Sequence, residues 1–121
     1  MAPSTEWWPY RNQLLVTLAS MKGVSMGLKS LMVGTVKSDG FHKDGTETFY
    51  KRINSLMNYQ EGEIIIECPA IHLSTIELIQ MSSVPDEILL WAHSCHTSNR
   101  PCGHCRGCYK YIKIIEALRL Q

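Results

Sequence analysis

The chain of 121 residues lacks both a long apolar run and an excess of charge of one sign. Uninterrupted apolar runs such as Ile88–Ala92 fall far short of the roughly 18 residues that span a bilayer, so no membrane segment is expected. Twelve Lys and Arg residues balance eleven Asp and Glu, and the basic ones are scattered. Because nucleic-acid binding needs a concentrated basic surface, nucleic acid is not an expected partner.

The first ten residues, MAPSTEWWPY, lack the basic start and apolar stretch of a secretory signal. We therefore expect a reducing, cytoplasmic compartment, in which cysteines stay as thiols. Neither an internal repeat nor a low-complexity tract is evident. A composition of 45% hydrophobic and 19% charged residues is ordinary for a globular protein, and the length predicts one domain or part of one.

Four of the five cysteines lie within fourteen residues, at the spacing C-x6-C-x2-C-x2-C: Cys95, Cys102, Cys105 and Cys108. Four thiolates this close together form a complete tetrahedral shell for one zinc ion. Pro101, Gly103 and Gly107 give the loop the bends that such a shell needs. Because no position is left open for water, the predicted zinc is structural and does not act as a Lewis acid.

Other interpretations of the cysteines fit less well. Two disulfides suit a secreted protein, and dithiol exchange needs only one C-x-x-C unit. His96 and His104 lie beside the cluster and are alternative ligands, although four cysteines already saturate zinc. Cys68 lies outside the cluster, at the end of a predicted buried strand. This position favours the role of a small buried apolar residue over that of a nucleophile.

Apolar spacing predicts helices over 12–26 and 46–58, and short buried strands over 30–36 and 63–68. This order predicts a right-handed β-α-β unit with parallel strands. Asp44, three residues before Glu47, has the form of a helix-capping pair. The polar stretch 37–45 follows the carboxyl end of the first strand, where ligands bind in open α/β sheets.

Downstream, Ser74 and Glu77 form a capping box that opens a short helix through about Met81. A second helix is predicted from the segment 83–86 to Trp91, and an amphipathic closing helix over 109–120. Two parallel strands do not make a stable open sheet. Another part of a longer protein, or another chain, is therefore expected to supply the remaining strands.

Several segments together resemble the 7-cyano-7-deazaguanine synthase family, most closely its divergent synthase-like branch. They are W-W-P-Y-R-N-Q-L-L-V-T-L-A, the loop D-G-F-H-K-D-G, the segment E-x-P-A-x-x-L-S-x-x-E-L and the cysteine motif. The resemblance spans Trp8 to about Tyr111 and corresponds to the C-terminal half of the family domain. It implies one partial domain of the α/β class. Residues 1–90 would form a partial Rossmann-like parallel sheet with helices, of the adenine nucleotide alpha hydrolase type. Residues 91–121 would form a zinc-binding tail with four cysteines and a helix.

The resemblance also implies an activity and a set of site residues. Family members use ATP and Mg²⁺ to adenylylate the carboxylate of a 7-deazapurine, and ammonia then gives an amide and a nitrile. By resemblance, the four cysteines match the zinc ligands, and Arg11 and Asn12 match a pair beside the nucleotide. The residues that match the loop beside the deazapurine are Asp39, Gly40, Phe41 and Asp44.

Alternatives remain open for these residues. Asp44 is equally well explained as a helix cap, and Arg11 as a surface ion-pair partner. Trp7 and Trp8 suit an interface better than base stacking. The substrate loop has one residue more before Asp44 than typical members, and Thr46 stands where they carry Arg, so the base recognised need not be the usual one.

The phosphate-binding motif S-G-G-x-D-S does not occur in these 121 residues. The resemblance therefore implies that this chain is the C-terminal half of an enzyme and is inactive without the other half, which carries the ATP loop. The expected partners are a second copy of this chain or a second chain that supplies the ATP-loop half. The alternative is a non-catalytic structural zinc module or partner-binding subunit derived from the family.

Overall fold

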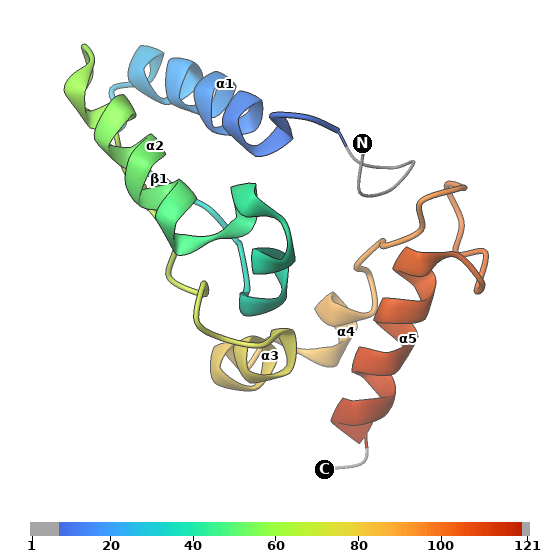
Figure 1. The fold of residues 1–121 in the computed structure, drawn as a ribbon. Helices are drawn as coiled ribbons and strands as arrows, with labels where there is room; N and C mark the ends of the chain where they lie inside the picture. The colour runs from blue at the N-terminus through green and yellow to red at the C-terminus, as the bar shows by residue number, and fades with distance from the viewer. Residues whose placement is uncertain (1–7, 120–121) are drawn as a thin grey trace. The chain divides into compact units, whose positions relative to one another are not determined.

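The computed structural model describes residues 8–119 (Figure 1). These residues divide into two compact units, with the boundary between His72 and Leu73. The sequence-based division at residue 90 separates a half domain from a cysteine tail, and it stays a prediction. Among residues 8–119, no helix combines the length and apolarity that a bilayer crossing needs.

The first unit is a β-α-β arrangement with one additional helix before it. Its elements are α1 (Arg11–Ser25), β1 (Ser30–Met32), the 3-10 helices η1 (Lys37–Phe41) and η2 (Lys43–Gly45), α2 (Glu47–Tyr59) and β2 (Ile65–Glu67). The strands are parallel, with Leu31 paired to Ile66, which confirms the predicted pairing. The mixed α/β class is confirmed with it.

Both strands are shorter than predicted, for local backbone reasons. Gly62 and Glu63 have φ values of 102° and 51°, so the chain is still turning where the second strand was expected to begin. Pro69, which has no N–H to donate, follows soon after β2 ends. On the other strand, Val33 donates a last bond to the Glu67 carbonyl, and the chain then leaves the sheet.

One face of the sheet carries the core of this unit. Successive side chains of a strand point to opposite faces, and the buried cluster contains residues from α1, α2 and the β2 region: Val16, Tyr50, Ile53, Ile64 and Ile66. Leu31 packs against this cluster, whereas Met32 and Ile65 on the other face are exposed. The predicted burial on both faces is therefore not found within residues 8–119.

The cap of α2 corrects a prediction. Thr46 is the N-cap residue, and its hydroxyl accepts a hydrogen bond from the Phe49 backbone N–H at 3.3 Å. Asp44 does not cap the helix, because it lies in η2 and the chain adopts the extended cap conformation only at Thr46. The prediction of an Asp44–Glu47 capping pair was wrong.

The second unit contains three helices among its described residues: α3 (Thr75–Ser82), α4 (Asp86–Leu89) and α5 (Arg106–Arg119). The Ser74 capping box is confirmed, with Glu77 N–H donating to the serine hydroxyl at 3.2 Å and Ser74 N–H to the glutamate at 2.7 Å. Pro85 immediately precedes α4, which is shorter than predicted. Helix α5 begins three residues before the predicted start at 109, and Leu120 lies outside the described residues.

Asn54 of α2 protects the outer edge of β2. Its Oδ1 accepts a hydrogen bond from the backbone N–H of the buried Ile66 at 2.6 Å. We predict that Asn54→Ala lowers the free energy of unfolding by about 1–3 kcal/mol, because a buried N–H loses its partner. Urea unfolding followed by circular dichroism measures this loss. Asn54→Asp, which keeps an acceptor oxygen, is the matched control, and equal losses in both variants would contradict the account.

Candidate metal centre

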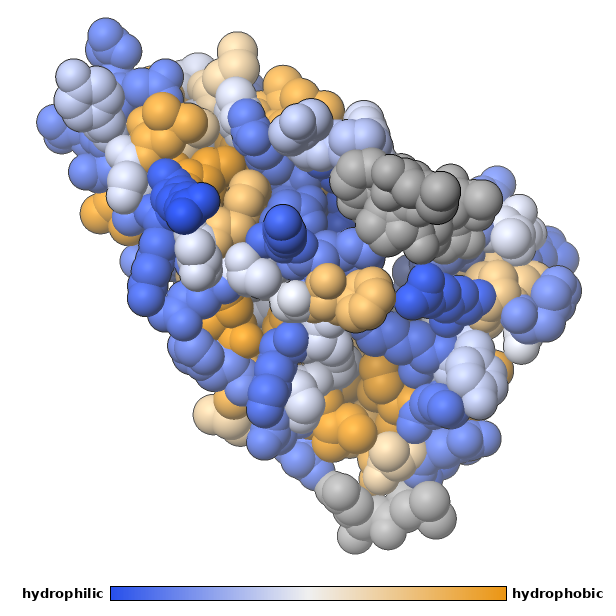
Figure 2. All heavy atoms as spheres, viewed as in Figure 1, coloured by the Kyte–Doolittle hydropathy of each residue, from blue (hydrophilic) through white to orange (hydrophobic). Residues whose placement is uncertain are grey.

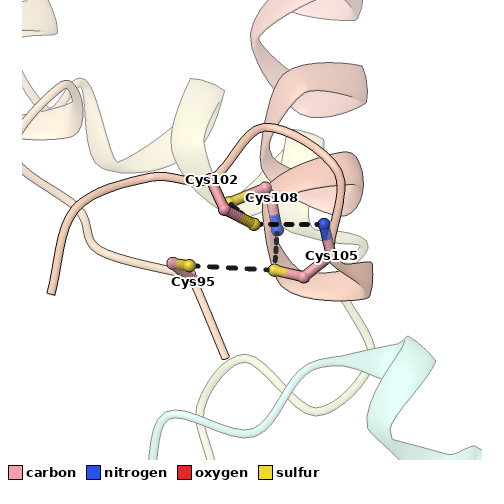
Figure 3. Close-up of side chains that lie close together, drawn as sticks. All are labelled: Cys95, Cys102, Cys105 and Cys108. Carbon is pink, nitrogen blue, oxygen red and sulfur yellow. Dashed lines mark hydrogen bonds between the residues drawn. The ribbon is translucent and has the colours of Figure 1, made fainter. Parts of the chain in front are cut away.

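The four clustered cysteines converge from three short stretches of the second unit. Cys95 lies in the segment after α4, Cys102 and Cys105 lie in the loop that follows, and Cys108 lies in the first turn of α5 (Figure 3). Their sulfur atoms all lie within 4.8 Å of one another. Among residues 8–119, no other group of three or more Cys, His, Asp or Glu side chains is placed to hold a metal ion.

The spacing of the sulfurs fits a tetrahedral metal site. Zinc–sulfur bonds of about 2.3 Å place neighbouring sulfurs at the corners of a tetrahedron with edges of about 3.8 Å. The Cys95 and Cys105 sulfurs are 3.9 Å apart, and those of Cys102 and Cys108 are also 3.9 Å apart. All four cysteines are free thiols, so the cluster can hold a metal ion.

Backbone N–H groups support the sulfur atoms. Cys105 Sγ accepts hydrogen bonds from the N–H groups of His96 and Cys108, both at 3.4 Å. Cys102 Sγ accepts one from the Cys105 N–H at 3.3 Å. Donors of this kind stabilise negative charge on sulfur and fix the direction of each ligand. Cys105 therefore lies at the centre of this network.

The thiols differ in their affinity for protons. Hydrogen bonds from Thr97 lower the pKa of Cys95 to about 5 and that of Cys102 to about 7. For Cys108, a backbone hydrogen bond from Gly103 acts to lower the pKa, but burial and the sulfurs of Cys105, Cys95 and Cys102 outweigh it and raise the value to about 11. Crowded sulfurs resist complete ionisation unless a cation neutralises them.

Gly107 permits the close approach that closes the cluster. A Cβ atom at this position would collide with the Ser94 carbonyl oxygen and the His96 ring. Gly103 has a φ of 79°, in the left-handed region that glycine adopts without strain. Next to it, His104 Nδ1 lies 2.8 Å from the Cys102 carbonyl oxygen, so this ring contacts the backbone of the loop and is not part of the sulfur cluster.

An open cavity of about 470 Å³ lies beside Cys95 within the second unit. Apolar side chains of α3 and α5, among them Ile79 and Ile114, form part of its wall, and Lys110 lines it as well. Tyr111 is another lining residue, and its hydroxyl donates to the Leu89 carbonyl at 3.4 Å.

Cys68 belongs to the first unit and not to the metal cluster. It is partly buried against the apolar core, and burial raises the pKa of its thiol. Both observations fit a small apolar residue and not an activated nucleophile.

The first unit brings the other predicted site residues together. Asn12, in the first turn of α1, donates from Nδ2 to the backbone carbonyl of Asp44 at 2.9 Å. Arg11 is exposed, and its Nε donates to Asn12 Oδ1 at 3.2 Å. Although 32 residues separate Asn12 from Asp44, the start of α1 and the loop 37–45 are thus joined by a direct bond.

The Asp39 carboxylate is occupied within its own loop. Its Oδ2 accepts hydrogen bonds from the Val36 N–H at 3.0 Å and the Thr35 hydroxyl at 3.4 Å. The neighbouring Gly40 and Phe41 are exposed. Gly45 closes the loop, because a Cβ there would collide with the Asp39 carbonyl oxygen. Asp39 therefore shapes the loop, and Phe41 is its most accessible apolar side chain.

The structure also identifies supporting residues that the sequence did not single out. Thr97 Oγ1 lies 3.5 Å from Cys95 Sγ, and the Thr35 hydroxyl donates to the Asp39 carboxylate at 3.4 Å. Burial is the largest cause of the raised pKa of Tyr50, which keeps its hydroxyl protonated. Among the residues that the sequence analysis missed, only the helix cap Thr46 carried a signal in the sequence. Threonine is a common N-cap residue, and the acidic Glu47 that follows it is typical of a first helical turn.

Comparison with known proteins identifies the family. Residues 2–116 match the profile described as Queuosine biosynthesis protein QueC. The chain belongs to the QueC family. Curated QueC relatives named 7-cyano-7-deazaguanine synthase include those of Campylobacter fetus subsp. fetus, 29% identical over 93% of this chain and 52% of the relative, and Methanobrevibacter smithii, 26% identical over 88% and 48%. That of Nitratiruptor sp. is 28% identical over 89% and 51%.

The chain thus spans about half the length of the curated QueC relatives it matches. Membership confirms the family resemblance seen in the sequence, and the QueC family implies a Rossmann-like fold, in line with the parallel strands of the first unit.

We predict that Cys105→Ser abolishes stoichiometric metal binding and destabilises α5, because the variant removes one ligand and the acceptor of two N–H bonds. Elemental analysis and thermal melting of the purified protein measure both effects. Cys68→Ser makes the same chemical change outside the cluster and is expected to retain the metal. A Cys105→Ser protein with full metal content and native melting would exclude a structural metal site.

Proposed function

We propose that this chain acts as the C-terminal, cysteine-bearing half of a 7-cyano-7-deazaguanine synthase-like enzyme. The complete enzyme adenylylates the carboxylate of a 7-deazapurine with ATP, releasing pyrophosphate, and ammonia then displaces AMP to give an amide. A second ATP adenylylates the amide oxygen, and loss of this oxygen with AMP and of the amide protons gives the nitrile. The observation that supports this most is the bond between Asn12 and Asp44, because it joins the segment that resembles the nucleotide side to the segment that resembles the base loop.

Each residue has a distinct part in this proposal. Arg11 is exposed at the start of α1, where a guanidinium suits phosphate oxygens. Asn12 holds the base loop against the helix, and Asp39 holds the turn that presents Gly40 and Phe41. The exposed Phe41 ring offers a flat apolar surface to a deazapurine.

The metal proposed for the cysteine cluster is one zinc ion. Four sulfurs that all lie within 4.8 Å of one another, with two of the sulfur–sulfur distances at 3.9 Å, match the preference of zinc for four thiolates. When bound, zinc crosslinks the loop to α5 and leaves no open position for a reactant. A reducing compartment such as the cytoplasm would keep the four thiols available.

The ATP-binding part of the proposed enzyme is supplied from outside these 121 residues. Phosphates are bound by sets of oriented backbone N–H groups, and the S-G-G-x-D-S motif that would provide them does not occur in the sequence. Residues of an ATP-loop half, in the same longer polypeptide or in a second chain, complete the site together with Mg²⁺.

A second candidate function is a non-catalytic zinc module or partner-binding subunit derived from the family. The observation that favours this second function is that the S-G-G-x-D-S motif does not occur in these 121 residues. Residues without a set of phosphate-binding groups cannot activate a carboxylate with ATP by themselves. The two functions differ in whether this chain completes an AMP-forming enzyme.

The test combines the chain with a purified ATP-loop half from the synthase of Campylobacter fetus. We expect the chain to contain one zinc and to form no AMP alone, and the mixture to form AMP when 7-carboxy-7-deazaguanine and ammonia are added. Asn12→Ala should reduce AMP formation roughly tenfold or more, because the base loop loses its anchor.

The matched control is Asn58→Ala, which removes an amide–carbonyl bond to Glu63 far along the sequence from the loop. It is expected to retain the activity of the mixture. AMP formation by the isolated chain would contradict the need for a second half. A stable, zinc-loaded complex that forms no AMP would favour the non-catalytic module.

A further inference from the structure

The cavity beside the cysteine cluster has an apolar wall that three helices build. Ile79 of α3, Leu89 of α4 and Ile114 of α5 line it, and all three are half-buried. All of its lining residues belong to the second unit, and its volume of about 470 Å³ is in the range of small-molecule sites. Figure 2 shows apolar side chains among these helices, bordered by hydrophilic ones. A ligand in this cavity would bury an apolar body against the helices.

One face of α5 combines this apolar wall with polar groups. Gly107, Lys110, Tyr111 and Ile114 recur at helical spacing, and all four line the cavity. Because Gly107 has no Cβ, the Ser94 carbonyl oxygen comes close to the first turn of α5. This close approach brings the segment after α4 to the same cavity as Lys110.

The polar groups of the cavity favour an anion. Of the described residues that line it, none is acidic, and Lys110 makes no ion pair with any residue in the range 8–119. The segment 93–113 contains four Lys or Arg residues and no Asp or Glu. A lysine ammonium has three donors, and here the fold supplies no carboxylate for them. The charge in the cavity is therefore available to a ligand of opposite sign.

A rival partner for Lys110 is the cysteine cluster itself. Four thiolates around one divalent ion leave a net negative charge, and Cys95 lines the same cavity. A lysine that only offset this charge would raise the affinity for the metal, but it would leave the apolar wall without a role. Metal content and ligand binding, measured on the same variant, distinguish the two.

We propose that this cavity binds a small carboxylate with an apolar body, such as a medium-chain aliphatic acid. The Lys110 ammonium pairs with the carboxylate, the hydroxyls of Thr75 and Ser94 are further donors, and the apolar body lies along Ile79 and Ile114. A phosphate fits less well, because phosphate sites use several cations or a set of backbone N–H groups. This ligand is additional to the metal and to the deazapurine of the proposed function.

The cavity is distinct from the residues for which the sequence predicts an interface. Trp8 belongs to the first unit, is 58% exposed and does not line the cavity. Trp7 lies outside the described residues. The carboxylate site therefore makes no use of a partner at this segment.

The test is a calorimetric titration of sodium octanoate into the full, metal-loaded chain. We expect saturable binding of one octanoate per chain, with a dissociation constant below about 1 mM, which is within reach of a ligand of this size. Octan-1-ol keeps the apolar chain without the charge and should bind roughly tenfold more weakly or worse. Acetate keeps the carboxylate without the chain and should show no saturable binding at the same concentrations.

Two lysine variants test the proposed ion pair. Lys110→Met keeps an apolar stem without the charge and should weaken octanoate binding about tenfold or more, because the carboxylate loses its cation. Lys113→Met is the matched control, since Lys113 lies one turn further along α5 and places its Nζ 4.5 Å from the Tyr109 ring centroid. It is expected to retain the affinity for octanoate, and elemental analysis should find full metal content in both variants.

Several results would overturn the proposal. They are a wild-type chain without saturable octanoate binding, equal affinities for octanoate and octan-1-ol, and equal losses in the two lysine variants. Loss of the metal in Lys110→Met would also overturn it, because Lys110 would then act on the cysteine cluster. Octanoate affinity should be unchanged when a purified ATP-loop half is added; if it is lost, a segment of that half fills the cavity and the proposal fails.

Discussion

The second unit depends on the four converging cysteines, because it contains very little apolar core. Among residues 73–119, only Gly107 and Cys108 are buried, and α3 and α4 contribute no buried residue. Helix α5 is amphipathic, yet Ile112 on it remains exposed and Ile114 and Ile115 are only half-buried. A small unit with so little buried apolar surface normally needs a disulfide or a metal for its stability. A metal ion held by the loop and the first turn of α5 would provide that crosslink.

The first unit is organised differently, around an apolar core that is independent of a metal. Val16, Ile53 and Ile66 bring α1, α2 and β2 together, and this packing places the start of α1 beside the loop 37–45. Helix α1 therefore has two structural roles within the first unit: its buried side completes the core, and Asn12 at its first turn fixes the loop.

The parts of the structure that the sequence predicts best are those set by local chemistry. Cysteine spacing predicts the sulfur cluster, the Ser74–Glu77 pair predicts the start of α3, and the apolar periodicity predicts α1 and α2 to within a residue or two. Strand ends were missed because they depend on the turn at Gly62 and Glu63. The wrong prediction of a cap at Asp44 has a similar origin. Asp44 and Thr46 are both suitable N-cap residues for α2, but Asp44 lies in η2, so the helix begins after Thr46. Contacts over a long sequence separation, such as Asn12 with Asp44, leave no local signal.

Amide hydrogen exchange of the full chain, with bound metal and after chelation, tests the dependence of the second unit on the metal most directly. The account predicts that chelation removes protection from α5 and the segment 94–108, whereas the α2 amides near Ile53 keep theirs, because their protection comes from the apolar core. Protection of α5 that is unchanged after complete removal of the metal would contradict the account, since packing alone would then hold the second unit together.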